Sequence, residues 1–225
     1  MRNENPLYTS VLDYNDLVVH QRVERQMSII QKYLKNNKAT ILDVGSFGGV
    51  LVHTLFNSGY KKLFGCDVFD SKNTINTPIS FSVEDITKKT GYKTNTFDLS
   101  IASHVLEHVF DVRGALIEMK RITKKNGYIL ICLPLEVNIS IRLKVLLKGR
   151  IGDPFTVGSH IKFFHPYDLE KELKYHNMRI LEKTYSGLGY GKFDSSPIGF
   201  IMKFLANLQP KFFAGEVQYL LQNKK

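Results

Sequence analysis

An aspartate and three glycines form the stretch with the most chemical content in this 225-residue chain. Thr40–Val44 is a short apolar run typical of a buried parallel strand, and Asp43 lies inside it. Gly45, Gly48 and Gly49 follow at once, and apolar residues at helical spacing come next. Such a strand, glycine turn and helix start build a nucleotide site, because glycines let the backbone approach a ligand and the helix start offers free N–H groups. The acid before the first glycine disfavours a pyrophosphate and favours a cationic nucleoside.

The spacing D-x-G-x-x-G-G resembles motif I of the class I S-adenosylmethionine-dependent methyltransferases, commonly D-x-G-x-G-x-G. Phe47 stands where the middle glycine of that motif often stands. S-adenosylmethionine carries an ammonium and a sulfonium group and no phosphate, in keeping with the acid. A second acid, Asp67, lies 22 residues after Gly45, at the end of a predicted strand over 62–68. At this spacing a carboxylate accepts hydrogen bonds from the ribose hydroxyls in nucleotide-binding folds.

A longer resemblance runs from Phe97 to Pro134 and includes SHVLEHVFD and a Lys-Asn-Gly turn before a hydrophobic run. It looks like the stretch after motif III of small-molecule methyltransferases, a group that includes ubiquinone and menaquinone C- and O-methylating enzymes. The implied fold is α/β and Rossmann-like: a seven-stranded, mostly parallel sheet with an antiparallel last strand and helices on both faces. We expect residues 1–225 to form one S-adenosylmethionine-dependent methyltransferase domain, with a helical cap at 1–37 and a substrate-side insertion at 136–160.

The resemblance also implies which residues contact the cofactor. An acid after the third predicted strand often binds the adenine amino group; Asp85 fits that role, and Ile86 would pack on the ring. The alternative for Asp85 is ordinary turn chemistry. The expected cofactor-binding residues are Asp43, Gly45, Ser46, Phe47, Gly49, Asp67, Val68, Asp85, Ile86, Ser103 and His104.

Histidines are the candidate bases. Methyl transfer to a sugar hydroxyl needs a base, because the proton leaves as the oxygen attacks. Four histidines lie in loops expected above the sheet, and we select His104 and His160 as candidate catalytic residues. Each is otherwise a hydrogen-bonding loop residue. The segment that begins at His160 resembles the H-x-x-F-F-x-P-x-x-L segment of bacterial methyltransferases whose acceptors are sugars or lipid-linked glycans.

A metal-binding pattern is also present. His104, Glu107 and His108 match H-x-x-E-H, the zinc signature of inverzincin peptidases. That signature needs both histidines on one helix, whereas here it directly follows a predicted buried strand, which excludes the peptidase. Some ubiquinone-pathway O-methyltransferases have an acid, a glutamate and a histidine at these positions and bind a divalent ion. His104 in place of the acid argues against that ion, so we expect no metal, with Glu107 and His108 holding the loop together.

Residues 137–149 carry conflicting signals. Alternation of apolar and polar residues favours a strand, whereas Leu146, Leu147 and Gly149 favour a helix, which we predict. Further helices are predicted at 16–36, 49–57, 111–124 and 166–175, with a helical or loop excursion at 195–209. Strands are predicted at 40–44, 62–68, 79–83, 97–103, 128–133, 179–186 and 216–221.

Composition fits one globular domain, with 43% hydrophobic and 23% charged residues. No apolar run approaches the roughly 20 residues of a membrane span, and the polar N-terminus lacks the apolar core of a signal peptide. We therefore expect a cytoplasmic protein in which Cys66 and Cys132 are reduced, buried thiols. The net charge of +10 favours an anionic partner: nucleic acid, a phosphorylated sugar or an acidic membrane surface.

These features predict an S-adenosylmethionine-dependent methyltransferase that O-methylates a small or lipid-linked acceptor, such as a cell-surface glycan precursor. The basic insertion would contact a lipid-linked or phosphorylated acceptor, with peripheral membrane contact, or would instead pack in the core. Methylation of tRNA is an alternative that the charge favours, although an N-P-P-Y-type motif and an RNA-binding module are missing. A non-catalytic protein that binds S-adenosylmethionine is a second alternative. An NAD-dependent enzyme is a third, disfavoured by Asp43 and by the missing G-x-G-x-x-G.

Overall fold

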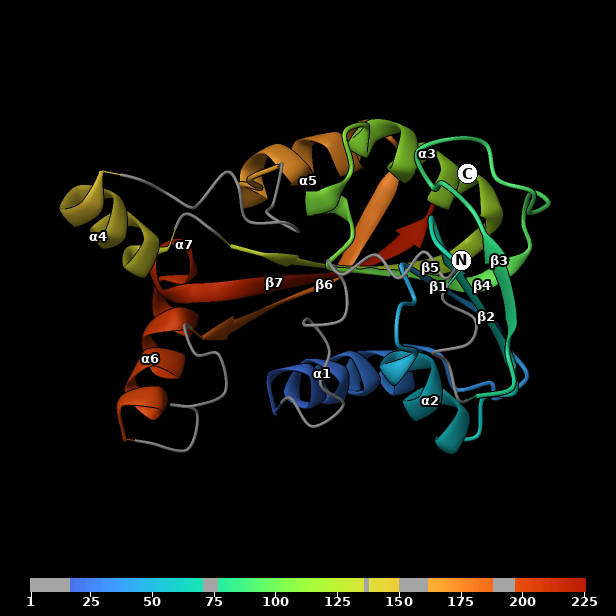
Figure 1. Ribbon diagram of the computed structural model, residues 1–225, viewed down its shortest axis with the longest axis horizontal. Coiled ribbons are helices and arrows are strands. Elements are labelled where there is room, and N and C mark those ends of the chain that lie inside the picture. The colour runs from blue at the N-terminus through green and yellow to red at the C-terminus, as the bar shows by residue number, and fades with distance from the viewer. Residues whose placement is uncertain (1–16, 71–76, 136–137, 150–161, 188–196) are drawn as a thin grey trace, which may run out of the picture.

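The computed structural model describes residues 17–70, 77–135, 138–149, 162–187 and 197–225. Within these ranges seven strands form one sheet in the order β3-β2-β1-β4-β5-β7-β6 (Figure 1). β7 is antiparallel to both of its neighbours, β5 and β6, and all other neighbouring pairs are parallel. This confirms the mostly parallel sheet with an antiparallel last strand. The strands are β1 Thr40–Val44, β2 Lys62–Asp67, β3 Ser80–Val83, β4 Phe97–Ser103, β5 Thr123–Pro134, β6 Met178–Gly187 and β7 Ala214–Asn223.

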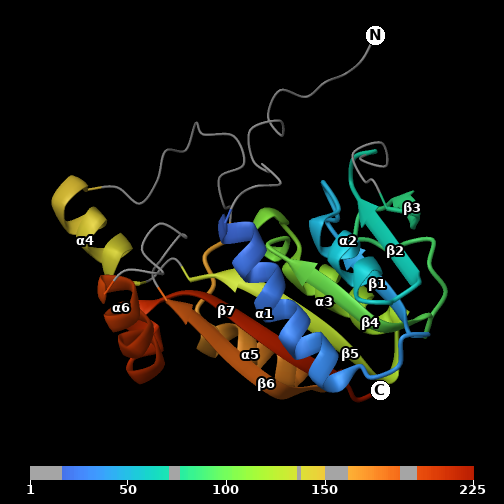
Figure 2. The ribbon, with the colours of Figure 1, turned by 90° about the horizontal axis from the view of Figure 1, so that it is seen from below.

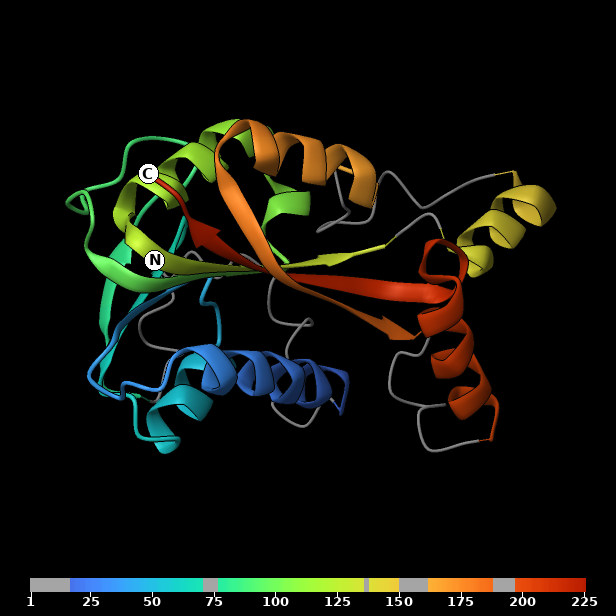
Figure 3. The same cartoon turned by 180° about the vertical axis from the view of Figure 1, so that it is seen from behind.

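Helices cover both faces of the sheet. In Figures 1 and 3, α1 and α2 lie on one face and α3 and α5 on the other. Figure 2 shows α4 and α6 together at one end of the molecule. The helices are α1 Leu17–Tyr33, α2 Val50–Asn57, α3 Val112–Ile122, α4 Ile139–Lys148, α5 Pro166–Tyr175, α6 Pro197–Leu208 and α7 Pro210–Phe213, with a short 3-10 turn, η2, at Leu106–His108.

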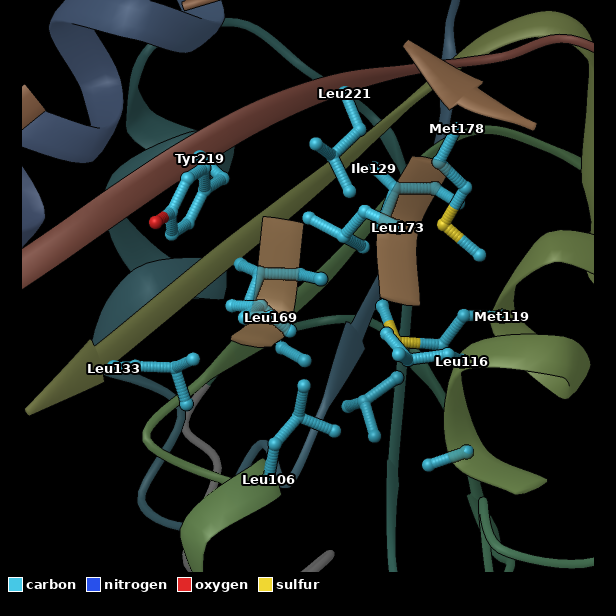
Figure 4. Packing of buried hydrophobic residues seen from close by; sticks show 14 of the residues in the cluster. Leu106, Leu116, Met119, Ile129, Leu133, Leu169, Leu173, Met178, Tyr219 and Leu221 are labelled. Atoms are coloured by element: carbon cyan, nitrogen blue, oxygen red, sulfur yellow. The ribbon is translucent and has the colours of Figure 1, made fainter. Parts of the chain in front are cut away.

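Two hydrophobic clusters fill the space between the helices and the sheet. The apolar residues at helical spacing in α1, together with the residue that follows the helix, are buried against one face of the sheet. They are Val23, Met27, Ile30 and Leu34. The cluster on the other face joins α3, α5 and η2 to β5 and β7 (Figure 4). Because each strand of the central parallel pairs is covered on both faces, these strands are apolar almost throughout.

The helix predicted for residues 137–149 is confirmed as α4. Asn138 caps it by accepting a hydrogen bond from the Ile141 N–H at 3.2 Å, and Gly149 ends it in the left-handed region at φ 67°. The prediction of a helix through Lys124 is wrong: α3 ends at Ile122, and β5 begins at Thr123 rather than Tyr128. Thr123 pairs with Phe97 of β4, and a bulge before Tyr128 absorbs the intervening residues.

Two further findings bear on the sequence predictions. Cys66 and Cys132 are free, buried thiols. Among the described residues, none of the helices has the length and apolar content needed to cross a bilayer.

Candidate active site

The glycine loop after β1 lies at the carboxyl edge of the sheet. The backbone N–H groups of Gly45 and Ser46 both donate to the carbonyl of Cys66 on β2, at 2.8 and 3.1 Å. Gly45, Gly48 and Gly49 have φ angles of 69°, 72° and 67°, a backbone region that residues other than glycine rarely adopt. The three predicted glycines are therefore required by the turn itself, and the last of them leads into α2.

Gly45→Ala tests this close approach. A Cβ on Gly45 would lie 2.5 Å from Cγ2 of Val105, and the backbone would also be strained at positive φ. We expect this variant to unfold at a lower temperature and to bind S-adenosylhomocysteine at least tenfold more weakly. Calorimetry checks both values, with Gly149→Ala as the control, because Gly149 is also at positive φ but has no atom within 4 Å of its Cβ position. Equal losses in both variants would show that the contact with Val105 has no role.

Asp43 is a buried carboxyl group in need of a cation. Burial, with a smaller contribution from the negative charge of Asp67, raises its pKa to about 8. In the described part of the chain no ion pair involves Asp43, and Arg22, which lines the same pocket, is paired with Glu216 instead. A cationic ligand would therefore stabilise the ionised form of Asp43.

Asp67 lies at the end of β2, next to the glycine loop. It is half-buried, and burial raises its pKa, whereas hydrogen bonds from the backbone N–H groups of Phe69, Val68 and Phe47 oppose that rise. The contact with Phe47 links Asp67 to the loop that follows β1. The structure thus brings the two acids that were predicted from sequence to one edge of the sheet.

A pocket of about 90 Å³ opens at this edge, between α1 and the carboxyl ends of β1 and β4. The residues that line this pocket include Arg22, Gln26, Asp43, Phe47 and Ser103. Ligand pockets typically have volumes of roughly 300–1,000 Å³, so a bound cofactor would extend beyond this pocket along the sheet edge. A larger, open hollow of about 500 Å³ lies at the amino ends of β1, β2 and β3. Ligands of parallel α/β sheets bind at the carboxyl ends, which favours the smaller pocket.

Gln26, which lines the pocket, has a buried side-chain oxygen, Oε1, without a hydrogen-bond partner among the described residues. The same is true of Ser46 Oγ in the glycine loop. The amide nitrogen of Gln26 donates to Ser103 Oγ at 2.7 Å and approaches Cys132 Sγ at 3.1 Å. Unpaired buried polar atoms are costly, so the unpaired oxygen of Gln26 in the pocket that Asp43 also lines favours a polar ligand there.

The remaining predicted cofactor residues have mixed surroundings. Asp85 accepts hydrogen bonds from the N–H and hydroxyl of Thr87, at 3.0 and 2.6 Å, and pairs with Lys88 at 3.1 Å. These contacts, led by the Thr87 hydroxyl, lower the pKa of Asp85. They are the turn chemistry named as the alternative for this residue. Ile86 is buried in the cluster beneath α3, and Val68 is exposed.

His104 is held between two carboxylates. Its Nε2 lies 2.8 Å from Glu216 Oε2 on β7, and its Nδ1 lies 3.1 Å from Oε1 of the fully buried Glu107. Burial lowers the pKa of His104, but the neighbouring Glu107 and Glu216 outweigh it, and the net shift is upward. The protonated ring, with both nitrogens engaged, is therefore the form that this arrangement favours. His104 itself has φ 56°, so its backbone is in the left-handed region.

Glu216 is the centre of this network. It also pairs with Arg22 Nε at 2.8 Å and with Arg25 Nη2 at 3.3 Å, both on α1, and it accepts from Gln218 Nε2 at 2.9 Å. Burial raises the pKa of Glu216, but the hydrogen bond and charge of His104, with smaller contributions from Arg22 and Gln218, outweigh it and hold the pKa well below its usual range. One carboxylate thus connects the last strand, the loop after β4 and the helix that covers the pocket.

Sequence reasoning missed three residues of this site: Arg22, Gln26 and Glu216. They belong to no motif, and they meet only because β7 inserts beside β5 and α1 lies across the sheet. A possible signal was two basic residues and a glutamine on one face of the predicted helix over 16–36.

The other predicted histidines are separated. His160 lies outside the described residues, and His108 is exposed at the end of η2. His165 caps α5, its Nδ1 accepting from the Tyr167 N–H at 3.3 Å. Of the three residues in the metal-binding pattern, His104 contacts Glu107 at 3.1 Å, and His108 is exposed. Within the described ranges, no three His, Cys, Asp or Glu side chains come together as metal ligands.

Comparison with known families agrees with this geometry. The family described as methyltransferase domain matches residues 18–183, well over half of the chain. The chain belongs to the methyltransferase domain family. This methyltransferase is 27% identical to the bovine (Bos taurus) mitochondrial ubiquinone biosynthesis O-methyltransferase over 210 residues, 85% of this chain and 55% of that protein. It is 29% identical to the human (Homo sapiens) enzyme of the same name over 169 residues, 68% of this chain and 44% of that protein. The chain therefore spans about half the length of these curated relatives.

Solved structures show the same fold at low identity. A putative methyltransferase from Bacillus halodurans C-125 superposes with a TM-score of 0.64 at 15% identity, covering 91% of this chain and all of that one. The phosphoethanolamine N-methyltransferase 2 of Haemonchus contortus, solved with S-adenosylmethionine, gives 0.60 at 11% identity, covering 90% of this chain and 53% of that one. The protein is an S-adenosylmethionine-dependent methyltransferase. The buried Asp43 carboxyl group and the unpaired Oε1 of Gln26 in the same pocket fit its cationic, polar cofactor.

Proposed function

We propose that this methyltransferase methylates a hydroxyl oxygen of a small acceptor. The observation that carries the proposal is the histidine–carboxylate network at the carboxyl edge, beside the pocket of Asp43. The cofactor, when bound, supplies an activated methyl group on a sulfonium. Asp43 would hold its ammonium group and Asp67 its ribose hydroxyls. Gln26 and Ser46 would complete its hydrogen bonds, while Arg22 and the rest of α1 exclude water.

The acceptor proton needs a destination, and His104 is the candidate base with a described position. His104 accepts a proton only when its ring is neutral, and Glu216 and Glu107 raise its pKa above the usual 6.5. A base role therefore predicts that kcat rises with pH through a value above 6.5. It also requires Nε2 to exchange its contact with Glu216 for one with the acceptor. His160 is proposed as the second candidate base.

His104→Asn is the variant that tests this role. Asparagine tolerates the left-handed backbone that His104 adopts, so the change removes the imidazole without adding strain. We expect kcat to fall by roughly 100-fold or more and the pH dependence above 6.5 to disappear. His165→Asn is the matched control, because asparagine also caps helices well, and its kcat should stay unchanged. An unaltered kcat in His104→Asn would remove His104 as the base.

Two acceptor classes follow from different observations. The names of the curated relatives point to a phenolic ubiquinone precursor. The H-x-x-F-F-x-P segment over 160–166 and His104 in place of an acid favour a sugar, including a lipid-linked glycan.

The test is to incubate the purified protein with S-adenosylmethionine labelled in its methyl group and a panel of dihydroxybenzoate and lipid-linked sugar acceptors. Polar and organic cell extracts are then tested as acceptors in the same way. An O-methyl ether in any product supports the proposal. Label on nitrogen or carbon contradicts O-methylation. No transfer to any fraction, by protein that binds S-adenosylhomocysteine, favours the non-catalytic alternative.

A further inference from the structure

α4, α6 and α7 lie together at one end of the molecule (Figure 1). These helices carry several exposed apolar side chains. Leu146 and Leu147 on α4 are 79% and 80% exposed, and Phe200 on α6 is 75% exposed. We call this surface the apolar end; its described apolar members are Leu143, Val145, Leu146, Leu147, Phe200, Ile201, Phe204, Leu208 and Phe212. Large apolar groups gathered in this way mark an interaction site rather than ordinary surface.

The charged residues in the sequences of α4, α6 and α7 are all basic. The three helices contain Arg142, Lys144, Lys148, Lys203 and Lys211 and no aspartate or glutamate. The guanidinium of Arg142 lies 4.6 Å from the ring centroid of Phe212, which joins α4 to α7. α7 also packs against α6, so α7 contacts both of the other helices.

This surface lies next to the active site. α4 begins shortly after Pro134, the last residue of β5, and α7 leads directly into β7. Pro134 pairs with Glu216, the third residue of β7, whose carboxylate contacts His104. The apolar end and the acceptor side of the site thus share the carboxyl edge of the sheet.

We propose that the apolar end docks on an anionic lipid bilayer surface and so presents the active site to acceptors held in that bilayer. The presentation of acceptors to the active site rests on the proposed function. The docking of the helices on a bilayer does not depend on it. Helices with exposed leucine and phenylalanine among lysine and arginine lie in the bilayer interface, where apolar groups enter the acyl boundary and cations meet anionic headgroups.

The composition favours a bilayer over other partners. Interfaces between protein copies are depleted in lysine, which the apolar end is not. Nucleic-acid surfaces bind through polar and stacking groups, whereas the most exposed residues here are leucines.

The experiment is flotation of the purified chain with vesicles of pure phosphatidylcholine or of phosphatidylcholine with 30% phosphatidylglycerol, in the absence of cofactor and acceptor. We expect partitioning onto the anionic vesicles that weakens as salt is raised. Leu146→Ser/Leu147→Ser should reduce it by roughly tenfold or more, and Lys148→Glu by roughly fivefold. Ile117→Ser/Val83→Ser, which alters exposed apolar residues on α3 and β3, should stay within about twofold of the unmodified chain.

Several outcomes would overturn the proposal. These are no binding to anionic vesicles, equal loss in the control variant, or a dimer seen by light scattering that Leu146→Ser/Leu147→Ser dissolves while vesicle binding is absent. Retention by bulk tRNA in place of vesicles would do the same and would revive the nucleic-acid alternative. Because vesicle binding is measured without cofactor or acceptor, and methyl transfer is measured without vesicles, failure of docking and failure of the proposed function are distinguishable.

Discussion

Asp43→Asn is expected to stabilise the ligand-free protein while weakening cofactor binding. The pKa of Asp43 in the folded protein, about 8, is above the ordinary 3.8. Between these values the folded state binds more protons than the unfolded state, so stability falls as pH rises through that window. At pH 7 this penalty is about 2–4 kcal/mol, which the neutral asparagine removes. Denaturant unfolding at pH 4 and pH 7 checks the expectation: the gain should be present at pH 7 and nearly absent at pH 4.

The same variant should bind S-adenosylhomocysteine roughly 10- to 100-fold more weakly, because it loses a charge-assisted hydrogen bond to the ligand ammonium. Asp98→Asn is the matched control. Asp98 accepts from the Thr40 N–H and pairs with Lys124 at the amino end of β4, so its loss should lower stability and leave affinity unchanged. A destabilised Asp43→Asn with undiminished affinity would contradict the role of Asp43.

Glu216→Gln is expected to cost about 2–4 kcal/mol of unfolding free energy. The substitution keeps the size of the side chain but leaves the buried cations of Arg22 and His104 without their shared carboxylate. Affinity for S-adenosylhomocysteine should also fall, because Arg22 and Gln26 on α1 line the pocket. Denaturant unfolding and calorimetric titration measure the two effects.

The difference in unfolding free energy between the unmodified protein and Glu216→Gln should depend on pH with a definite sign. Because the folded-state pKa of Glu216 is depressed, its contribution is present above the ordinary 4.5 and is lost as pH falls further. The raised pKa of His104 gives a contribution that is present below 6.5 and is lost as pH rises through the folded value. The gap between the unmodified protein and Glu216→Gln should therefore be widest between about pH 5 and pH 6.5.

Glu172→Gln is the control for Glu216→Gln. Glu172 also pairs with an arginine, Arg113, at 2.6 Å, but Arg113 is mostly exposed and water screens the pair. Glu172→Gln should therefore lose much less unfolding free energy than Glu216→Gln. Comparable losses would show that the network around Glu216 is no more than an ordinary surface ion pair.

Local patterns predicted most of the fold. β1, β4 and α5 have the predicted bounds, because an apolar run, a proline at a helix start and helical spacing are signals within a few residues. The predicted end of α3 was wrong because residues 124–127 have the sequence of a helix terminus. In the structure Thr123 already pairs with β4 and belongs to the sheet. Tertiary contact there overrides the local signal.

The residues of the strand–turn–helix unit were predictable, whereas the network that joins α1, the loop after β4 and β7 was not. Asp43, Asp67 and the glycines stand at fixed spacings along one strand–turn–helix unit. Glu216 is 112 residues from His104, and Gln26 is 77 residues from Ser103, so only the sheet order brings them together. His104 was recognised as a candidate base, but its two carboxylate neighbours could not be foreseen from the loop alone.

The crystal structure of the complex with S-adenosylhomocysteine tests the central claim most directly. The account predicts that the ligand amino group lies within hydrogen-bond distance of the Asp43 carboxylate and that the ribose hydroxyls face Asp67. It also predicts that α1 covers the ligand, with Gln26 in contact. A ligand bound in the hollow at the amino ends of the strands, or one whose amino group avoids Asp43, would contradict it.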